Sequence, residues 1–281
     1  MDSKKRKAAV GVIAGLIIII MIVILILLIP IEKRNTENEK YGELAVAAET
    51  DDRARYIIDN IEEYPNDILQ IYYNSYDEYK DEVLEFVYGY VQHKNDYASM
   101  SYTDEELNSE EPPCLYMNDT RWAYEKIGDR YIHESGCATV SITMAYLYLT
   151  HQSDINPKII ADLAEKNNEV DFWDGINSLY IKEICETIGL NCTEFNFDKD
   201  SGGSGEADLE YIKNAIDSGH VIIAGMVGET FGGHALIIRQ ANSDGTIYIN
   251  DPANPENSEK EWSFDELKPE IYYIWDLSYS K

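Results

Sequence analysis

The chain has 281 residues, of which 44% are hydrophobic, and its 52 acidic and 23 basic side chains give a net charge of -29. This apolar content is enough for a folded core and excludes a wholly disordered chain. The negative charge argues against nucleic acid as a partner, because phosphate binding needs clustered Lys and Arg. It argues equally against docking on anionic surfaces.

Residues 8–31 contain no charged side chain and are rich in Ile and Leu. A helix needs about 20 apolar residues to cross the hydrocarbon of a membrane. The stretch is longer than the apolar part of a cleaved signal peptide, and no small-residue cleavage site directly follows it. The basic run Lys4-Lys5-Arg6-Lys7 precedes it and marks the cytoplasmic side. We therefore predict a single-pass protein of the cell membrane, with a cytoplasmic tail over residues 1–7, a transmembrane helix over residues 8–31 and an extracellular C-terminal domain.

Residues 32–113 are predicted to form an acidic helical stalk followed by a linker. Apolar residues recur there at three-to-four-residue spacing, which predicts two or three amphipathic helices. The stalk tyrosines fit helix packing better than a binding surface. Residues 102–113 contain an acidic run and two consecutive prolines, a composition typical of a linker.

Residues 114–281 are enough for one domain. Four segments have the pattern of helices: residues 138–150, which are apolar nearly all round, 157–166, 176–190 and 209–217. Four more have the pattern of strands: residues 221–227, 234–240, 246–250 and 271–275. The turn Asn242-Ser243-Asp244-Gly245 joins two of these strands into a hairpin. Helices first and antiparallel strands later predict an α+β domain.

Only one of the four cysteines lies where a nucleophile is expected. Cys137 follows Gly136 and opens the buried helix, so its sulfur is expected at the positive end of the helix dipole, which stabilises a thiolate. Cys185 lies inside a predicted helix, and Cys114 and Cys192 lie at junctions. A small buried cysteine at a helix start is the ordinary alternative for Cys137.

His234 and Asp251 shift the balance toward catalysis. His234 follows two glycines, which leave room for a substrate backbone beside the imidazole. If the hairpin turn centres on residues 242–245, Asp251 returns to within about one residue of His234. A carboxylate there can hold the imidazole in the tautomer that accepts the thiol proton. Each residue alone fits an ordinary turn or strand end, whereas the three together favour a catalytic site. His220, in contrast, has no acid placed to orient it.

Four motifs occur in order: Tyr116-Met117-Asn118-Asp119-Thr120-Arg121-Trp122, Ser135-Gly136-Cys137-Ala138-Thr139-Val140-Ser141, Gly233-His234-Ala235-Leu236-Ile237-Ile238, and Asp244-Gly245 with Asn250-Asp251-Pro252. Together they resemble the bacterial C39-like cysteine peptidases, from about Leu115 to the C-terminus. The resemblance implies a papain-like fold, in which a buried N-terminal helix carries the cysteine and an antiparallel sheet carries the histidine and aspartate. It implies that Cys137 is the nucleophile, His234 the general base and Asp251 the orienting acid.

The sequence departs from the family pattern at two points. The family commonly has Gly-Pro after the cysteine, where this chain has Ala138-Thr139. The family also places a glutamine two residues before the aspartate of the Asp-x-Arg-Trp stretch, and its amide helps to form the oxyanion hole. Met117 occupies that position here, so either Asn118 donates instead, beside the Cys137 N–H, or the oxyanion hole is incomplete. We predict that Asn118 is the donor.

No Cys/His spacing suits zinc, and we predict neither a metal nor a cofactor. Outside the cell Cys185 and Cys192 could form a disulfide, although helix packing of Cys185 is the simpler interpretation.

The predicted function is that of a membrane-anchored extracytoplasmic cysteine peptidase, which cleaves amide bonds in a peptide or protein substrate such as a cell-wall peptide. The alternatives are a papain-like cell-wall amidase or acyl transferase, and a catalytically inactive surface binding protein that retains the fold.

Overall fold

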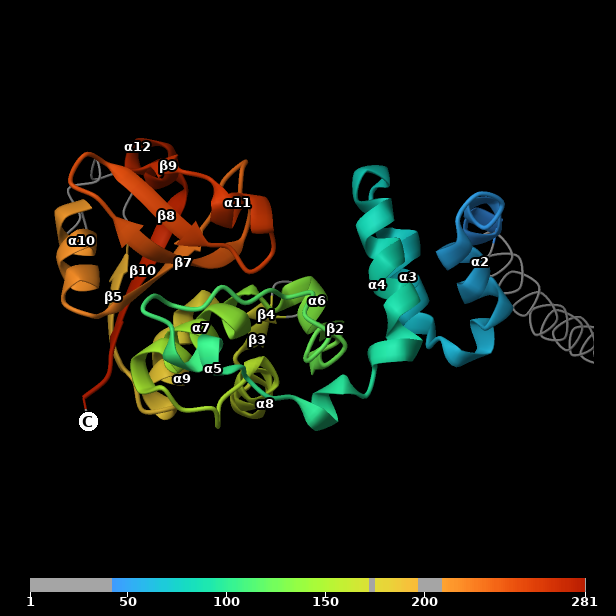
Figure 1. Cartoon of the computed structure of the whole chain (residues 1–281), viewed down its shortest axis with the longest axis horizontal. Coiled ribbons are helices and arrows are strands. Elements are labelled where there is room, and N and C mark those ends of the chain that lie inside the picture. Colours follow the sequence, from blue (N-terminus) through green and yellow to red (C-terminus); the bar gives the residue numbers. More distant parts are fainter. Residues whose placement is uncertain (1–41, 172–174, 197–208, 281) are drawn as a thin grey trace, which may run out of the picture. The chain divides into compact units, whose positions relative to one another are not determined.

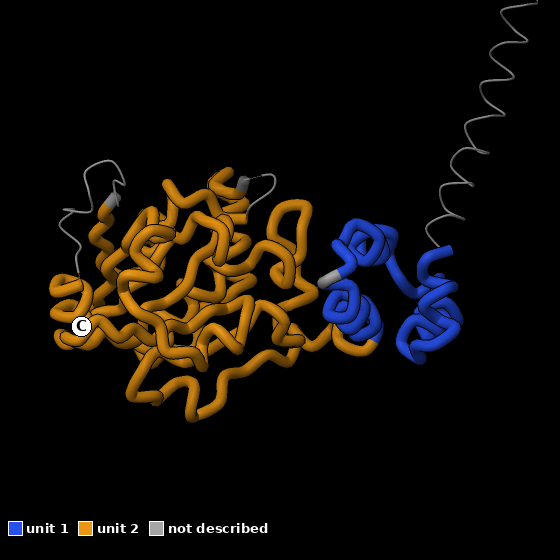
Figure 2. The backbone as a smooth tube through the Cα atoms, turned by 90° about the horizontal axis from the view of Figure 1, so that it is seen from above, with its two compact units in different colours: residues 1–91 blue, residues 92–281 orange. Residues whose placement is uncertain are grey.

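The structure is a computed structural model that describes residues 42–171, 175–196 and 209–280. The chain divides into two compact units, residues 1–91 and 92–281 (Figure 2). Across the described residues, no helix has both the length and the apolar content needed to span a membrane. The predicted tail and transmembrane helix over residues 1–31 lie outside the described residues.

The first unit contains the amphipathic helices that the sequence predicts: α2 (Asp52–Asp59), α3 (Asn66–Asn74) and all but the last two residues of α4 (Lys80–His93). Arg53 links α2 to α4 through ion pairs with Asp81 at 2.5 Å and Glu85 at 3.1 Å. Arg53 also binds Asp51, the residue that caps α2. Part of the acidic stalk is therefore an ordered helical unit.

The second unit starts before the predicted domain boundary at residue 114. The predicted linker contains a short helix, α5 (Asp104–Asn108), which contacts α7 (Cys137–Thr150). Arg121 holds α5 in place, because its guanidinium binds Glu106 at 2.7 Å and Asp119 at 2.6 Å. Tyr102, at the entry to α5, is buried. The acidic composition alone gave no sign of this distant arginine partner.

A layer of helices follows: α6 (Ile132–Ser135), α7, α8 (Pro157–Asn167) and α9 (Ile181–Thr187). Helices α7 and α8 match the prediction, but the predicted helix over residues 176–190 is shorter. Its first part is a strand, β4 (Gly175–Ile176), which pairs with β3 (Val170–Asp171), and a 3₁₀ turn over Ser178–Tyr180 precedes α9. A second small ribbon joins β1 (Lys126–Ile127) and β2 (Arg130–Tyr131).

The C-terminal half forms an antiparallel sheet with the strand order β5-β10-β6-β7-β8-β9 (Figure 1). Its strands are β5 (Asn191–Asn196), β6 (Val221–Met226), β7 (His234–Ala241), β8 (Thr246–Asn250), β9 (Trp262–Ser263) and β10 (Ile271–Ser278). The short helices α11 (Pro255–Glu259) and α12 (Phe264–Leu267) lie between the last strands in sequence. The domain is therefore α+β, as predicted.

Both faces of the sheet are covered. Helix α7 contacts β6 and β7, and so does α10 (Leu209–Asp217). Along β6, Val221 and Ile223 belong to the core that includes α7, whereas Ile222 and Ala224 belong to the core that includes α10. This two-residue alternation between two buried faces explains why the strand is apolar without interruption.

The β7–β8 register differs from the predicted one. Ile237 pairs with Asn250, so continuing the ladder by one residue places Asp251 across from Leu236 rather than His234. The pairing register shifts within β7, between Ile238 and Gln240. Because residues two apart share a face of the sheet, Asp251 still lies diagonally across from His234 on the same face.

Cys185 in α9 and Cys192 in β5 are buried free thiols in the core that includes α7. A hydrogen bond between the two thiols and their burial raise the pKa of Cys185. The structure therefore has the packed form of this pair and not the disulfide.

Candidate active site

Cys137 is the first residue of α7, and the junction before it is tight. A Cβ on Gly136 would lie 2.4 Å from the carbonyl oxygen of Ile132, so only glycine fits between α6 and α7. A Cβ on Gly175, whose φ is +80°, would lie 2.2 Å from the carbonyl oxygen of Ser135. Two glycines thus fix the junction that places the Cys137 sulfur at the helix N-terminus.

His234 is the first residue of β7 and bonds to Asp251, which directly follows β8. The distance between His234 Nε2 and Asp251 Oδ1 is 2.7 Å. The remaining ring nitrogen, Nδ1, is then the one available to the thiol, and the interaction between Cys137 and His234 shifts the pKa of both groups. The ring of Phe231 stacks on the imidazole of His234, with ring centroids 6.5 Å apart and planes 5° apart. The structure thus brings Cys137, His234 and Asp251 together.

Asp251 is 2% exposed, and its carboxylate is well supplied with donors. Asn257 Nδ2 donates to Oδ2 at 2.8 Å, and the backbone N–H of Ala253 donates to Oδ1 at 2.9 Å. Asn257 lies in α11, and its carbonyl oxygen accepts a hydrogen bond from the Trp262 indole at 3.0 Å. These contacts fix both the charge and the orientation of the acid.

The electrostatics of the three groups are consistent with an ion pair. Burial alone would raise the pKa of Cys137, but the hydrogen bond and positive charge of His234 and nearby backbone N–H groups bring it below its usual value. Burial alone would lower the pKa of His234, but Asp251 and Cys137 raise it to about 10. For Asp251, burial opposes ionisation, and the bonds from His234 and Asn257 lower its pKa nonetheless. The directions of these shifts all favour a thiolate on Cys137 beside an imidazolium on His234.

The two residues discussed for the oxyanion hole lie outside the pocket beside Cys137. Asn118 is exposed, and Met117 is buried with its N–H bonded to the Pro252 carbonyl at 2.8 Å. Neither is among the residues that line this pocket. Backbone N–H groups at the start of α7, including that of Cys137, have no intrahelical acceptor and remain as donors there.

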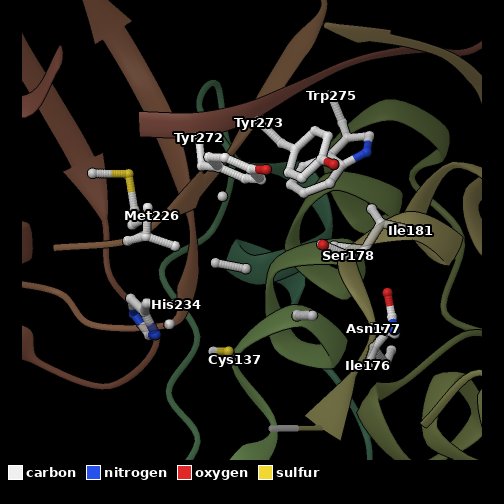
Figure 3. Close-up of a pocket in the computed structure, with 15 residues that line it drawn as sticks. Cys137, Ile176, Asn177, Ser178, Ile181, Met226, His234, Tyr272, Tyr273 and Trp275 are labelled. Atoms are coloured by element: carbon white, nitrogen blue, oxygen red, sulfur yellow. The ribbon is translucent and has the colours of Figure 1, made fainter. Parts of the chain in front are cut away.

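The pocket beside Cys137 and His234 has a volume of about 180 Å³ and lies between the helical layer and the sheet (Figure 3). In the part of the chain that the structure describes, no group of three or more His, Cys, Asp or Glu side chains could hold a metal ion. The arrangement can therefore supply a thiolate nucleophile, a proton carrier and an orienting carboxylate to a carbonyl compound in the pocket.

Sequence reasoning missed the groups that support these three residues. Asn257 had a weak signal, because Asn254-Pro255 predicts a helix start five residues after the strand that ends at Asn250. The only sequence signal for Phe231 was its position before Gly232-Gly233. Neither pattern indicates which side chain these residues contact.

The match to one protein-family model agrees with the sequence motifs. The family model for the Peptidase C39-like family matches residues 116–279, more than half of the chain. A solved peptidase domain of Streptococcus ComA, a bifunctional ABC transporter involved in a quorum sensing pathway, is 14% identical with a TM-score of 0.38, over 52% of this chain and 92% of that one. A double glycine motif protease from an AMS/PCAT transporter, solved in complex with the leader peptide, is 12% identical with a TM-score of 0.34, over 61% of this chain and 94% of that one. No curated protein matches the sequence.

Proposed function

The chain belongs to the Peptidase C39-like family, and we propose that it is a cysteine peptidase in which Cys137, His234 and Asp251 carry out amide hydrolysis. The observation that carries this proposal is that Cys137, at the N-terminus of α7, shares one pocket with His234, whose Nε2 is held by Asp251 Oδ1 at 2.7 Å. A half-buried thiol with a lowered pKa beside a charged imidazole is the activated nucleophile that acyl transfer requires.

The proposed reaction has two halves. The Cys137 thiolate attacks the amide carbonyl carbon, the carbon–nitrogen bond breaks, and the His234 imidazolium gives its proton to the leaving amine. This leaves an acyl thioester on Cys137 and a neutral imidazole. Water then attacks the thioester as His234 takes a proton from it, and breaking the carbon–sulfur bond restores the thiolate and the imidazolium. Asp251 holds Nε2 throughout, so that Nδ1 faces the sulfur and the substrate.

For the oxyanion, we propose the backbone N–H of Cys137 as the first donor, since it opens α7. As a second donor we retain Asn118, whose side chain would have to turn toward Cys137 when substrate binds. Asn118→Ala is then expected to lower kcat by about 100-fold, as for other oxyanion donors. An unchanged kcat in Asn118→Ala would show that only backbone N–H groups donate to the oxyanion.

The test of the proposed function uses the full chain in detergent and a mixture of peptides, with cleavage products identified by mass spectrometry. Cleavage by the native chain, and none by Cys137→Ala or His234→Ala, is expected. A cell-wall peptide substrate enters the same assay as isolated peptidoglycan beside plain peptides. If Cys137→Ala cleaved as well as the native chain, the proposed mechanism would be wrong.

One observation favours a second function, a surface binding protein that retains the fold. Met117 is buried at the position where the family pattern has the oxyanion glutamine. This rival predicts that Cys137 reacts with iodoacetamide no faster than an ordinary exposed thiol. The peptidase predicts fast labelling of Cys137 well below pH 8, lost in His234→Ala.

We also propose that residues 8–31 anchor the protein in the cell membrane, with the N-terminus in the cytoplasm and the peptidase domain outside. The support is the uncharged run of residues 8–31 and the basic residues before it. Deletion of residues 1–34 should move the protein from the membrane to the soluble fraction. A protease added to intact cells should degrade the C-terminal domain of the full chain. Protection of that domain in intact cells would reverse the proposed orientation.

A further inference from the structure

The pocket beside Cys137 is apolar over most of its surface. Six large side chains line it: Ile176, Ile181, Met226, Tyr272, Tyr273 and Trp275 (Figure 3). Among its lining residues, all within the described part of the chain, none is Asp, Glu, Lys or Arg. The strongly acidic composition of the chain therefore does not extend into this pocket.

The aromatic wall of the pocket is built by an irregularity in β10. Neighbouring residues of a regular strand point to opposite faces, but the β10–β6 register shifts between Ile271 and Tyr273. A bulge of this kind redirects a side chain, so both Tyr272 and Tyr273 line the pocket. Their rings meet edge to face, with centroids 4.6 Å apart, and Tyr273 stacks on Trp275 at 5.3 Å.

The position of Trp275 is fixed from two sides. Its indole N–H donates to Glu194 Oε2 at 2.9 Å, which satisfies its only polar atom. A Cβ on Gly225, in the adjacent strand β6, would lie 2.9 Å from the indole ring, so glycine leaves room for the ring. The wall is thus formed before any substrate binds.

The position of His234 indicates which part of a substrate would enter. In the proposed reaction His234 protonates the leaving amine, so the amine part of the substrate lies on its side of Cys137. Ile176 and Ile181 lie on the other side of Cys137 from His234 (Figure 3). These residues would therefore contact the acyl part.

The size of the pocket sets the size of the group. A dry cavity of about 150 Å³ lined by Leu, Ile and Phe binds benzene, and this pocket has about 180 Å³. An aliphatic or aromatic side chain of Leu to Phe size fits, whereas a carboxylate or ammonium would lose its water against the apolar and aromatic wall.

Resting on the proposed peptidase function, we propose that this pocket binds an apolar side chain, of Leu to Phe size, on the acyl side of the substrate within two residues of the cleaved bond. The enzyme would then select peptides by one bulky apolar residue next to the cleavage site. A substrate with glycine at both of the last two residues before the cleaved bond would make no side-chain contact with the aromatic wall.

The test uses dipeptidyl acyloxymethyl ketones, which carry only the acyl side of a substrate. The Cys137 thiolate displaces the carboxylate leaving group, forming a carbon–sulfur bond as the carbon–oxygen bond breaks. Gly, Leu, Phe or Asp is placed at each of the two positions, and the rate of Cys137 alkylation in the full chain is measured by mass spectrometry. Leu or Phe at one position is expected to react about tenfold or more faster than Gly, and Asp no faster than Gly.

Two variants at the rim of the pocket connect this selectivity to the structure. Tyr272 is 40% exposed, so Tyr272→Ala should fold and should lower the ratio of the Phe to the Gly rate several-fold. Ser178→Trp fills the opposite side and should lower the same ratio. Tyr180→Ala is the matched control, because Tyr180 is 37% exposed and does not line the pocket, and its ratio should match the native one.

The iodoacetamide rate separates the two proposals. Fast iodoacetamide labelling of Cys137 with equal rates for Gly, Leu and Phe probes would overturn the pocket assignment and leave the peptidase proposal standing. Labelling of Cys137 at the rate of an ordinary thiol would overturn the peptidase proposal and, with it, the assignment. Selectivity for Phe that survives in both rim variants would place the apolar subsite elsewhere.

Discussion

Asn257 donates a hydrogen bond of 2.8 Å from its side-chain amide to Oδ2 of Asp251, on the opposite side of the carboxylate from His234. The other oxygen, Oδ1, accepts from His234 Nε2 at 2.7 Å. Because both oxygens are held, the carboxylate cannot rotate away from the imidazole without breaking a charge-assisted bond. Asn257 therefore acts as a positioning residue for the acid of the proposed site.

The first prediction concerns this amide. Asn257→Ala should lower kcat/KM about tenfold, the scale of one hydrogen bond to a charged group. Losing the donor raises the pKa of Asp251 and weakens its hold on His234, so the acid limb of Cys137 alkylation should move to higher pH. Rates of peptide cleavage and of iodoacetamide labelling, each measured across pH, check both effects.

Asn257→Asp provides a sharper comparison, since it keeps the shape and places a like charge beside Asp251. It should lower activity further than Asn257→Ala. Asn242→Ala, in the exposed hairpin turn, is the control for an Asn-to-Ala change outside the site and should have native activity. If Asn257→Ala only lowered thermal stability and left the pH profile unchanged, its role would be structural.

The second prediction is a difference between two pH profiles. Alkylation of Cys137 needs only the thiolate, so it should rise well below the usual thiol pKa and stay high at alkaline pH. Peptide cleavage also needs the His234 imidazolium, whose pKa is about 10, so cleavage should fall as the pH approaches 10. Because Cys137 and His234 titrate together, the rise in alkylation and the fall in cleavage report the pKa values of the pair and not of either residue alone. His234→Ala should move the alkylation limb to higher pH, and an unmoved limb would contradict the ion pair.

The sequence allowed the three central residues to be predicted because each has a local signal. Gly136 before an apolar helix placed Cys137 at a helix start, and the hairpin brought Asp251 back toward His234. The predicted register was wrong because the offset is already present beside the turn, where Ala241 pairs with Ile247, and the shift between Ile238 and Gln240 removes only one residue of it. The contact between His234 and Asp251 is still made, because residues two apart share a face of the sheet.

The supporting groups could not be predicted because their partners are distant in sequence. His220 illustrates this, since the sequence showed no acid to orient it, yet its Nδ1 lies 2.7 Å from Asp276 Oδ1. Asp276 pairs with Ile222 across the β10–β6 ladder, and only that pairing brings it near His220. The aromatic wall likewise depends on a bulge in β10 that no residue pattern signals.

The third prediction tests the junction before Cys137. Gly136→Ala should strongly destabilise the protein or displace the α7 N-terminus, because its Cβ would lie 2.4 Å from the Ile132 carbonyl oxygen. Overpacking of this kind costs about 1–3 kcal/mol. Thermal unfolding and iodoacetamide labelling should therefore both change. Gly42→Ala is the control, since a Cβ there meets nothing within 4 Å. Native labelling and native stability in Gly136→Ala would contradict the tight junction.

The fourth prediction concerns stability in acid. Burial lowers the pKa of His133, in α6, from 6.5 to about 4. Between these values the unfolded chain binds a proton that the folded chain does not, so the free energy of unfolding should fall as the pH drops from 6.5 toward 4. The loss at pH 5 should be on the order of 2 kcal/mol.

His133→Gln removes this titration, so the difference between its denaturation midpoints at pH 7 and pH 5 should be smaller than in the native chain. Carboxylates titrate in both proteins and cancel in that comparison. His151→Asn, at the exposed end of α7, should keep the native difference, and equal differences in native and His133→Gln proteins would show that the acid sensitivity arises from other groups.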